Sequence, residues 1–309
     1  KEFQETPKRR IKGKFDKLSK IRKFRESIPD WMDSIGLEEL GENQWENEIS
    51  SLNKMAPVII RANALKTNII ELEKILINEE VVTEKINGYP DALKLKERTN
   101  LFLKDSFQNG LYEIQDASSQ LVAPFLKIEP GMKICDVCAG AGGKTLHLSA
   151  LSKNKGQIIA MDIYKNKLQE LKRRAKRNGA FNIETKVIEN NKSIKRLYGK
   201  IDRLLIDSPC SGLGVLKRNP DSKWKLSQEF LEKIKNTQQE ILQKYAPLIK
   251  NNGKLVYATC SILPSENEIQ IESFLKSNIG LKFKKEDEKK ISPSKTGFDG
   301  FYMARLSLK

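Results

Sequence analysis

The sequence KICDVCAGAGGKT at residues 133–145 decides the fold class. Its first five residues, Lys133 to Val137, form an apolar β-rich run, and the glycine-rich turn after them leads into a helical pattern of leucines. Glycines in such a turn let the backbone approach a ligand and adopt torsion angles that other residues avoid. The segment therefore predicts a strand, a ligand-binding turn and a helix, which together form one unit of an open α/β sheet.

Two common phosphate-binding motifs do not fit this turn. A P-loop requires a glycine five positions before Gly143, where the chain has Cys138, and the pattern G-x-G-x-x-G fails at Thr145. Asp162 ends the next β-rich run about 20 residues beyond the turn, where an acid can accept hydrogen bonds from a ribose diol. The combination indicates an adenosine-containing cofactor, and S-adenosylmethionine (SAM) fits better than NAD because it has no pyrophosphate. The alternative role for Asp162 is a helix N-cap.

Short β-rich runs alternate with helical patterns in the rest of the chain. The later runs are Gln157–Met161, Thr185–Ile188, Arg203–Ile206 and Lys254–Ala258. This alternation predicts an α/β domain over residues 113–309, with a parallel sheet and helices on both faces. The terminal run from Phe301 to Leu308 is predicted to add an antiparallel strand. Ser265 and Glu268 form a capping-box pattern, which predicts that a helix begins there.

The first 112 residues have a different organisation. Residues 1–28 form a basic segment of predicted helix, whose apolar residues recur at spacings near three and four. Residues 29–112 contain predicted strands at Val58–Arg61 and Val81–Ile86 and a predicted helix at Asn68–Asn78. We therefore expect a smaller α+β domain, RNA-recognition-like in outline, before the large sheet.

The charge of the chain favours a polyanionic partner. Lysine and arginine outnumber aspartate and glutamate by 56 to 40, and the formal net charge is +16, so nucleic acid is the first candidate. No run approaches the roughly 18 consecutive apolar residues that cross a bilayer, which predicts no membrane association and a cytoplasmic location. Four cysteines are too few for a disulfide framework. A monomer is the default expectation.

Two of the cysteines stand directly after predicted parallel strands. Cys210 lies in DSPCSG at residues 207–212, and Cys260 lies in ATCS at residues 258–261. Because the carboxyl ends of parallel strands meet at one edge of a sheet, the two thiols are predicted to share one pocket. Cys135 and Cys138 form C-x-x-C, but the chain has no second pair with zinc-ligand spacing, so no metal is expected.

Together these residues resemble the RNA 5-methylcytosine methyltransferase family named after Nol1, Nop2 and Sun, most closely its bacterial ribosomal RNA members of the RsmB type. The blocks that carry the resemblance are 138–145, Asp162, 207–212, RNPDSKW at 218–224, YATCS at 257–261 with Pro264, Glu266 and Asn267, RANALKT at 61–67 and QDASSQ at 115–120. One departure is Ser208, which stands where the family usually has alanine. The resemblance implies a Rossmann-like SAM-dependent methyltransferase sheet and a smaller N-terminal domain.

The resemblance also implies roles for individual residues. Cys260 would be the nucleophile that attacks carbon 6 of cytosine, Cys210 would assist product release, and Asp207 would hydrogen-bond the cytosine edge. The implied SAM contacts are Cys138, Ala139, Gly140, Ala141, Gly142, Gly143, Lys144, Asp162, Asp207 and, as the third cofactor acid, Glu189. The implied RNA contacts are Arg61, Lys144, Arg218, Lys223 and Trp224. Two points stay open: Lys144 could instead help to ionise Cys260, and Asn190 could take the position given to Glu189.

The implied reaction is methyl transfer from SAM to carbon 5 of a cytosine in RNA. Family likeness favours ribosomal RNA, with transfer RNA as an alternative. A base buried in a helix cannot present carbon 6, so the target should be single-stranded or flipped out. The nearest enzymatic alternative is a DNA cytosine methyltransferase, which uses the cysteine of a Pro-Cys pair as its nucleophile. An RNA-binding ribosome-assembly factor without turnover is the alternative from another class, although it would not need two such cysteines.

Overall fold

The computed structural model describes residues 8–309 and contains two sheets. The larger sheet consists of β5 Lys133–Val137, β6 Gln157–Asp162, β7 Ile183–Val187, β8 Ile201–Asp207, β9 Ile249–Thr259, β10 Phe283–Ile291 and β11 Phe301–Leu308. These seven strands lie in the order β10-β11-β9-β8-β5-β6-β7. The strands from β9 to β7 are parallel, whereas β10 and β11 are antiparallel to their neighbours. The predicted α/β fold class is therefore confirmed.

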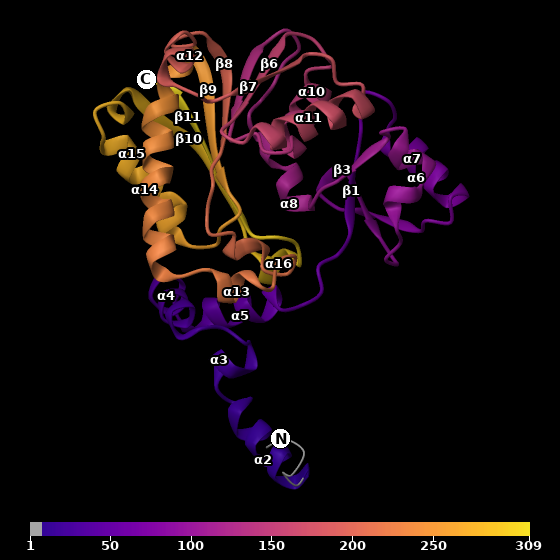
Figure 1. The fold of residues 1–309 in the computed structure, drawn as a ribbon, viewed down its shortest axis with the longest axis vertical. Helices are drawn as coiled ribbons and strands as arrows, with labels where there is room; N and C mark the ends of the chain where they lie inside the picture. Colours follow the sequence, from indigo (N-terminus) through magenta and orange to yellow (C-terminus); the bar gives the residue numbers. More distant parts are fainter. Residues whose placement is uncertain (1–7) are drawn as a thin grey trace.

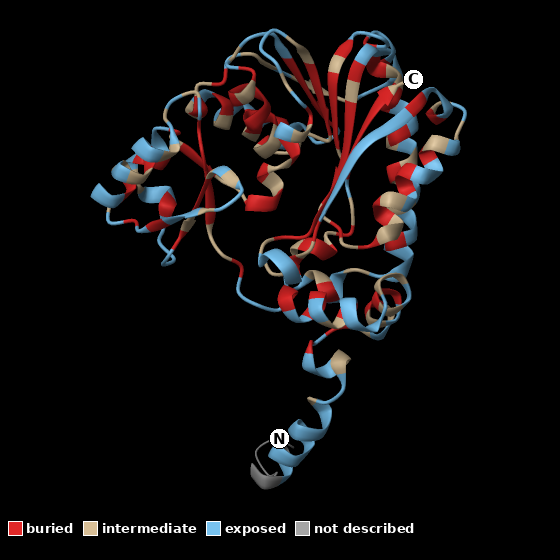
Figure 2. Ribbon diagram, turned by 180° about the vertical axis from the view of Figure 1, so that it is seen from behind, coloured by how far each residue is buried: buried red, intermediate tan, exposed pale blue. Residues whose placement is uncertain are grey.

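Helices cover both faces of the large sheet (Figure 1). They are α9 Val122–Phe125, α10 Gly143–Leu151, α11 Lys165–Asn178, α12 Asn191–Lys195, α14 Gln228–Tyr245 and α15 Glu268–Lys276. Successive residues of β5 face opposite sides of the sheet. Ile134 belongs to an apolar cluster with residues of α9 and α10, whereas Cys135 belongs to a cluster with residues of α14 and α15. The inner strands of the sheet are mostly buried in Figure 2, whereas the edge strand β10 is largely exposed. This burial explains why the parallel runs are apolar along their length.

Two details of the predicted large domain differ from the structure. The strand Phe301–Leu308 is antiparallel as predicted, but it lies between β9 and the additional edge strand β10. The capping box is wrong, because the hydroxyl of Ser265 donates to Glu39 at 2.7 Å instead of capping a helix. Residues Pro264–Glu266 form a short 3-10 turn, and α15 begins only at Glu268.

The smaller sheet is antiparallel and has the strand order β2-β3-β1-β4. Its strands are β1 Ile59–Ala62, β2 Thr83–Ile86, β3 Tyr89–Leu95 and β4 Tyr112–Ile114, with helices α6 Ile69–Asn78 and α7 Asp105–Gln108. The two predicted strands and the predicted helix of this region are present. Asn68 caps α6 by accepting hydrogen bonds from two backbone amides.

The helices α4 Asp30–Leu40 and α5 Glu42–Leu52 pack with segments that follow strands of the large sheet. Their buried side chains, including Trp45, form one apolar cluster with Leu213, Leu231 and Leu263. This packing differs from the prediction of one α+β domain over residues 29–112. The apolar faces of α4 and α5 pack against residues that follow β8 and β9 in the chain. The boundaries of the predicted domains stay predictions.

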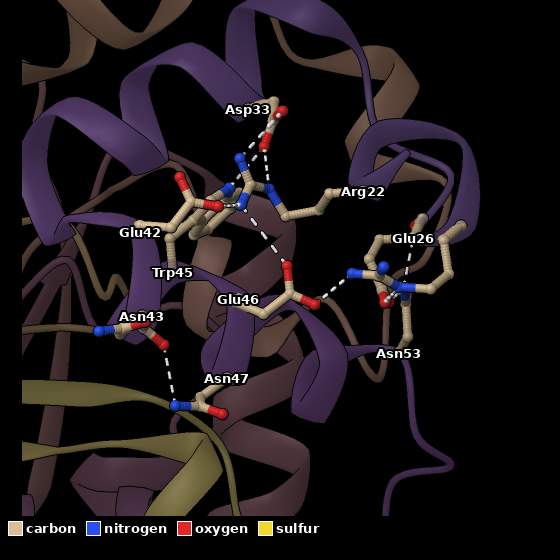
Figure 3. A network of polar contacts seen from close by, with 10 residues as sticks. Arg22, Glu26, Asp33, Glu42, Asn43, Trp45, Glu46, Asn47 and Asn53 are labelled. Carbon is tan, nitrogen blue, oxygen red and sulfur yellow. Dashed lines mark hydrogen bonds and ion pairs between the residues drawn. The ribbon is translucent and has the colours of Figure 1, made fainter. Parts of the chain in front are cut away.

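The N-terminal helices α2 Lys8–Leu18 and α3 Arg22–Arg25 lead away from the body of the molecule (Figure 1). Arg22 fastens α3 by donating to Asp33 at 2.7 Å and to Glu42 at 2.5 Å (Figure 3). Phe15 and Phe24, on the predicted apolar stripe, are 69% and 52% exposed. The stripe is therefore not packed. Across residues 8–309, none of the helices has the length and apolarity to span a membrane.

Candidate active site

The loop between β5 and α10 has the conformation that a close ligand contact requires. Cys138, Gly140 and Gly142 have φ angles of 70°, 55° and 89°, in the left-handed region. A Cβ on Gly142 would also lie 2.5 Å from Leu171, so both space and backbone conformation require glycine there. The loop lies at the carboxyl end of β5, where open α/β sheets bind ligands, and it is partly exposed except at the buried Gly142.

Asp162 closes this loop from the end of β6. One carboxylate oxygen accepts from the Gly140 amide at 2.8 Å and the other from the Tyr164 amide at 2.8 Å. Tyr164, and not Asp162, is the residue directly before α11, so the N-cap alternative does not hold. Asp162 lies beside the predicted cofactor loop, as expected. Glu189 lies beyond the end of β7 and is exposed.

Asp136 is a site residue that the sequence reasoning missed. It is buried in β5, and its Oδ2 accepts from the Thr145 hydroxyl at 2.6 Å. Its Oδ1 has no hydrogen-bond partner among residues 8–309, which is costly unless a ligand supplies a donor. Burial raises the pKa of Asp136 to about 7, although the Thr145 hydrogen bond opposes this shift. An acid inside an apolar run, two residues before the glycine turn, was the available signal.

An ion pair between Lys144 and Asp207 connects the start of α10 with the end of β8. The ammonium of Lys144, from the start of α10, lies 2.8 Å from the Asp207 carboxylate at the end of β8. It also lies 5.0 Å from the centre of the Phe301 ring. Burial opposes the charge on Lys144, but Asp207 outweighs burial and raises the Lys144 pKa, with a smaller contribution from Cys260. The Lys144 ammonium is thus paired with Asp207 and lies within electrostatic range of Cys260.

The two predicted cysteines meet at the ends of β8 and β9. Cys210 Sγ lies 3.4 Å from Cys260 Sγ, and both residues are partly exposed. The hydrogen bond with Cys260, burial, and the charges of Cys260 and Glu266 raise the pKa of Cys210 well above its ordinary value. Cys210 therefore keeps its proton and can donate it to the neighbouring sulfur. The two thiols therefore lie in contact, as their positions after neighbouring parallel strands predicted.

A buried carboxylate lies behind both cysteines. Glu266 accepts from the backbone amide of Ser211 at 2.7 Å and from its hydroxyl at 2.5 Å. The Ser261 hydroxyl donates to the same carboxylate, and so does the Gln238 amide at 3.1 Å. The sequence reasoning included Glu266 in a family block without a role, because its partners lie on three separate segments.

The predicted RNA-contact residues fall into two groups. Lys223 is buried and donates to the Glu26 carbonyl at 3.0 Å, and Arg61 is buried and donates to Gln115 at 2.6 Å. Both side chains are buried because each bridges separate segments of the fold, which a loop motif alone does not reveal. Their RNA contacts stay predictions.

Arg218 and Trp224 remain near the surface. Arg218 forms ion pairs with Asp299 at 2.6 Å and Asp116 at 2.8 Å, and its side chain is 31% exposed. Trp224, in the short helix α13 Ser222–Lys225, is 63% exposed. Their RNA contacts stay predictions. Between residues 8 and 309, no group of three or more His, Cys, Asp or Glu side chains could hold a metal ion.

Comparison with known proteins agrees with this geometry. The model of a family described as 16S rRNA methyltransferase RsmB/F matches residues 123–307. Ribosomal RNA small subunit methyltransferase B of Photorhabdus laumondii is 32% identical over 90% of the chain. The chain spans 57% to 66% of the length of its curated relatives in Synechocystis, P. laumondii and Bacillus subtilis.

Two solved structures share the fold over most of the chain. The crystal structure of PH0851 superposes with a TM-score of 0.87 at 30% identity, covering 92% of this chain and 67% of that one. NSun6 from Pyrococcus horikoshii, solved with SFG, superposes with a TM-score of 0.83 at 19% identity, covering 92% and 99%. The second likeness concerns the fold alone.

The seven-stranded sheet, the glycine loop and the acids beside it define the fold and cofactor site of a SAM-dependent methyltransferase. The unpartnered Asp136 oxygen and the left-handed backbone of the glycine loop fit a cofactor with a cationic amino acid end and an adenosine. The chain belongs to the RsmB/F family of 16S rRNA methyltransferases. The family resemblance and the SAM cofactor predicted from the sequence are thereby confirmed.

Proposed function

We propose that this chain transfers a methyl group from SAM to carbon 5 of a cytosine in RNA, through a covalent bond between Cys260 and carbon 6. The observation that carries the proposal is the 3.4 Å distance between the sulfurs of Cys210 and Cys260, beside the Lys144–Asp207 pair. One thiol suffices for nucleophilic attack. A second thiol in contact with it supports a reaction in which the first must also be released.

Carbon 5 of cytosine is a weak nucleophile, so the enzyme first has to raise its electron density. The Cys260 thiolate forms a bond to carbon 6, and the electron pair of the 5,6 double bond moves into the ring. Asp207 holds the polar edge of the base, and the Lys144 ammonium paired with it is a cationic neighbour of the reacting sulfur. Bound SAM supplies the electrophilic methyl group for carbon 5.

The second half of the reaction frees the enzyme. The proton on carbon 5 passes to water, the bond between carbon 6 and Cys260 breaks, and the 5,6 double bond forms again. Cys210, which is protonated and in contact with Cys260, gives its proton to the departing sulfur. The contact between the two sulfurs and the raised pKa of Cys210 support these two roles.

Ribosomal RNA is the proposed substrate because the curated relatives are named as methyltransferases of the ribosomal small subunit. The net charge of +16 supports a nucleic acid over a small molecule. Transfer RNA is the alternative substrate. A ribosome-assembly factor without turnover would leave the aligned thiols and the Lys144–Asp207 pair without a purpose.

The test is an incubation of the chain with methyl-labelled SAM and, separately, 16S ribosomal RNA, transfer RNA and a double-stranded DNA. The product is digested and its nucleosides are separated. We expect label in 5-methylcytidine from 16S RNA. Label only in transfer RNA would change the proposed substrate, and SAM binding without any labelled nucleoside would favour the assembly factor.

The proposed RNA-contact surface is a groove between the small sheet and α11. It encloses about 360 Å³ and is lined by Phe102, Phe107, Arg173, Arg174, Arg177 and cofactor-loop residue Ala141, among others. Phe102 is 58% exposed, and the Arg173 side chain is 80% exposed. An exposed aromatic ring beside guanidinium groups suits a single strand, which offers bases for stacking and phosphates for ion pairs. The groove extends the site from the cofactor loop onto the small domain.

Reversing one charge in this groove should weaken RNA binding in a salt-dependent way. In Arg173→Glu, we expect roughly 3- to 10-fold lower RNA affinity at low salt, and a salt slope smaller by about 1. Filter binding between low and moderate salt measures both, and SAM affinity serves as the internal control. Lys289→Glu on the edge strand β10 is the matched control. Equal losses in the two variants would indicate a general charge effect and not a specific surface.

SAM affinity should depend on pH through Asp136. Its pKa is about 7 in the free protein, because burial disfavours the carboxylate. A cationic group of SAM favours the ionised form, so SAM binding should expel a proton below that pH. We expect affinity to fall up to about tenfold per pH unit below pH 7, and to be flat above it. Calorimetry of Asp136→Asn should show weaker binding without this pH dependence, and an unchanged pH profile would contradict the assignment.

A further inference from the structure

The carboxylate of Glu266 connects the two loops that carry the reactive thiols. Ser211 directly follows Cys210, Ser261 directly follows Cys260, and both hydroxyls donate to Glu266 Oε2. The Ser211 amide donates to Oε1, so the Cys210 loop is held at two points. We propose that Glu266 is a positioning residue that sets the distance between Cys210 and Cys260 and so permits proton transfer between them. This inference rests on the proposed function.

Glu266 is itself rigidly held. It has 0% exposure, and Gln238 of α14 donates to its Oε1 at 3.1 Å. Its backbone carbonyl accepts from the Tyr257 hydroxyl in β9 at 2.8 Å. The carboxylate is therefore fixed relative to both β9 and α14. A loop that hydrogen-bonds to it takes its position from the sheet, which is how a scaffold fixes a reactive group to within a fraction of an ångström.

A buried carboxylate without a cation requires an explanation beyond stability. In the described part of the chain, Glu266 forms no ion pair, and its known partners are two serines, a glutamine and one backbone amide. An uncompensated buried charge usually costs stability. A glutamine would have nearly the same shape, but its amide nitrogen cannot accept from a hydroxyl. Only a carboxylate accepts from Ser211 and Ser261 at the same oxygen while the other oxygen accepts two N–H donors.

The charge of Glu266 also acts on the chemistry. After the hydrogen bond with Cys260 and burial, the Glu266 charge is among the causes that raise the pKa of Cys210. Glu266 does not touch Cys210 Sγ, so it acts through the loop and through its field. Cys210 would thereby be kept protonated and directed at Cys260, which is the state that the release step needs.

Glu266→Gln tests the proposal with two readouts. The first is independent of methyl transfer: diamide oxidation should form a Cys210–Cys260 disulfide in the wild type, and at least about fivefold more slowly in the variant, as followed by peptide mapping. The second is turnover, where we expect kcat to fall roughly 10- to 100-fold at an unchanged KM for RNA and unchanged SAM affinity. Glu268→Gln is the matched control, since Glu268 pairs with Lys290 and not with the cysteine loops.

The outcomes separate this inference from the proposed function. Wild-type rates of disulfide formation in Glu266→Gln would overturn it, whatever happens to turnover. If the wild type methylates no RNA but Glu266→Gln still forms the disulfide more slowly, the positioning role is supported and the proposed methyl transfer is rejected. If Glu266→Gln does not fold, Ser211→Ala and Ser261→Ala each remove one hydroxyl donor and should give smaller losses in the same two readouts. Wild-type values in both serine variants would then overturn the inference.

Discussion

Cys260→Ala should lower methyl transfer to RNA by at least about 1,000-fold, because the variant has no group that can add to carbon 6. Cys260 directly follows β9 and is not part of the loop at residues 138–143, which is the predicted cofactor contact. SAM affinity should therefore change by less than about twofold. Initial rates with labelled SAM measure methyl transfer, and calorimetry measures the SAM affinity.

Two variants make this result specific. Cys260→Ser replaces the thiol with a hydroxyl of similar size, but its oxygen is not ionised at neutral pH. We therefore expect a loss of methyl transfer close to that of Cys260→Ala. Cys135→Ala removes a sulfur from the core between β5 and the helices α14 and α15. It should cost stability and leave the rate per folded molecule near wild type. Turnover retained in Cys260→Ala would remove the nucleophile assignment.

The parallel core of the fold was predictable because its strands are buried on both faces. The run Lys133–Val137 was placed at its observed bounds, and the other four parallel strands were placed within a few residues. The edge strand β10 was not predictable from the same pattern. Its sequence FKKEDEKKI is exposed between Phe283 and Ile291, as is usual for edge strands, and only pairing with β11 defines it.

The candidate site was predictable where it depends on the ends of parallel strands. Cys210 stands a few residues after β8 and Cys260 directly after β9, so topology alone brings them together. The burial of Lys223 was not predictable, because its partner Glu26 is 197 residues away in the sequence. The role of Glu266 was hidden for the same reason: Ser211 lies 55 residues away. Local motifs identify reacting groups, whereas the groups that support them come from tertiary contacts.

Cys210→Ala should trap a covalent complex between enzyme and RNA. The variant can still form the bond from Cys260 to carbon 6, but it lacks the thiol that returns a proton to the departing sulfur at 3.4 Å. We expect the adduct fraction to rise from near zero to the majority of RNA-bound enzyme, and turnover to fall at least about 100-fold. A gel-shifted band that survives denaturation and requires both SAM and RNA would be the signature.

The same experiment decides between two assignments of the thiols. Cys210 belongs to a Pro-Cys pair, the arrangement that DNA cytosine methyltransferases use for the nucleophile, whereas the raised pKa of Cys210 argues for a proton donor. The double variant Cys210→Ala/Cys260→Ala should form no adduct, because the attacking sulfur is gone. Peptide mapping of the single-variant adduct should place the RNA on Cys260. An adduct formed by Cys260→Ala and carried on Cys210 would exchange the two roles, and the charge provided by Lys144 would then have to act on the other sulfur.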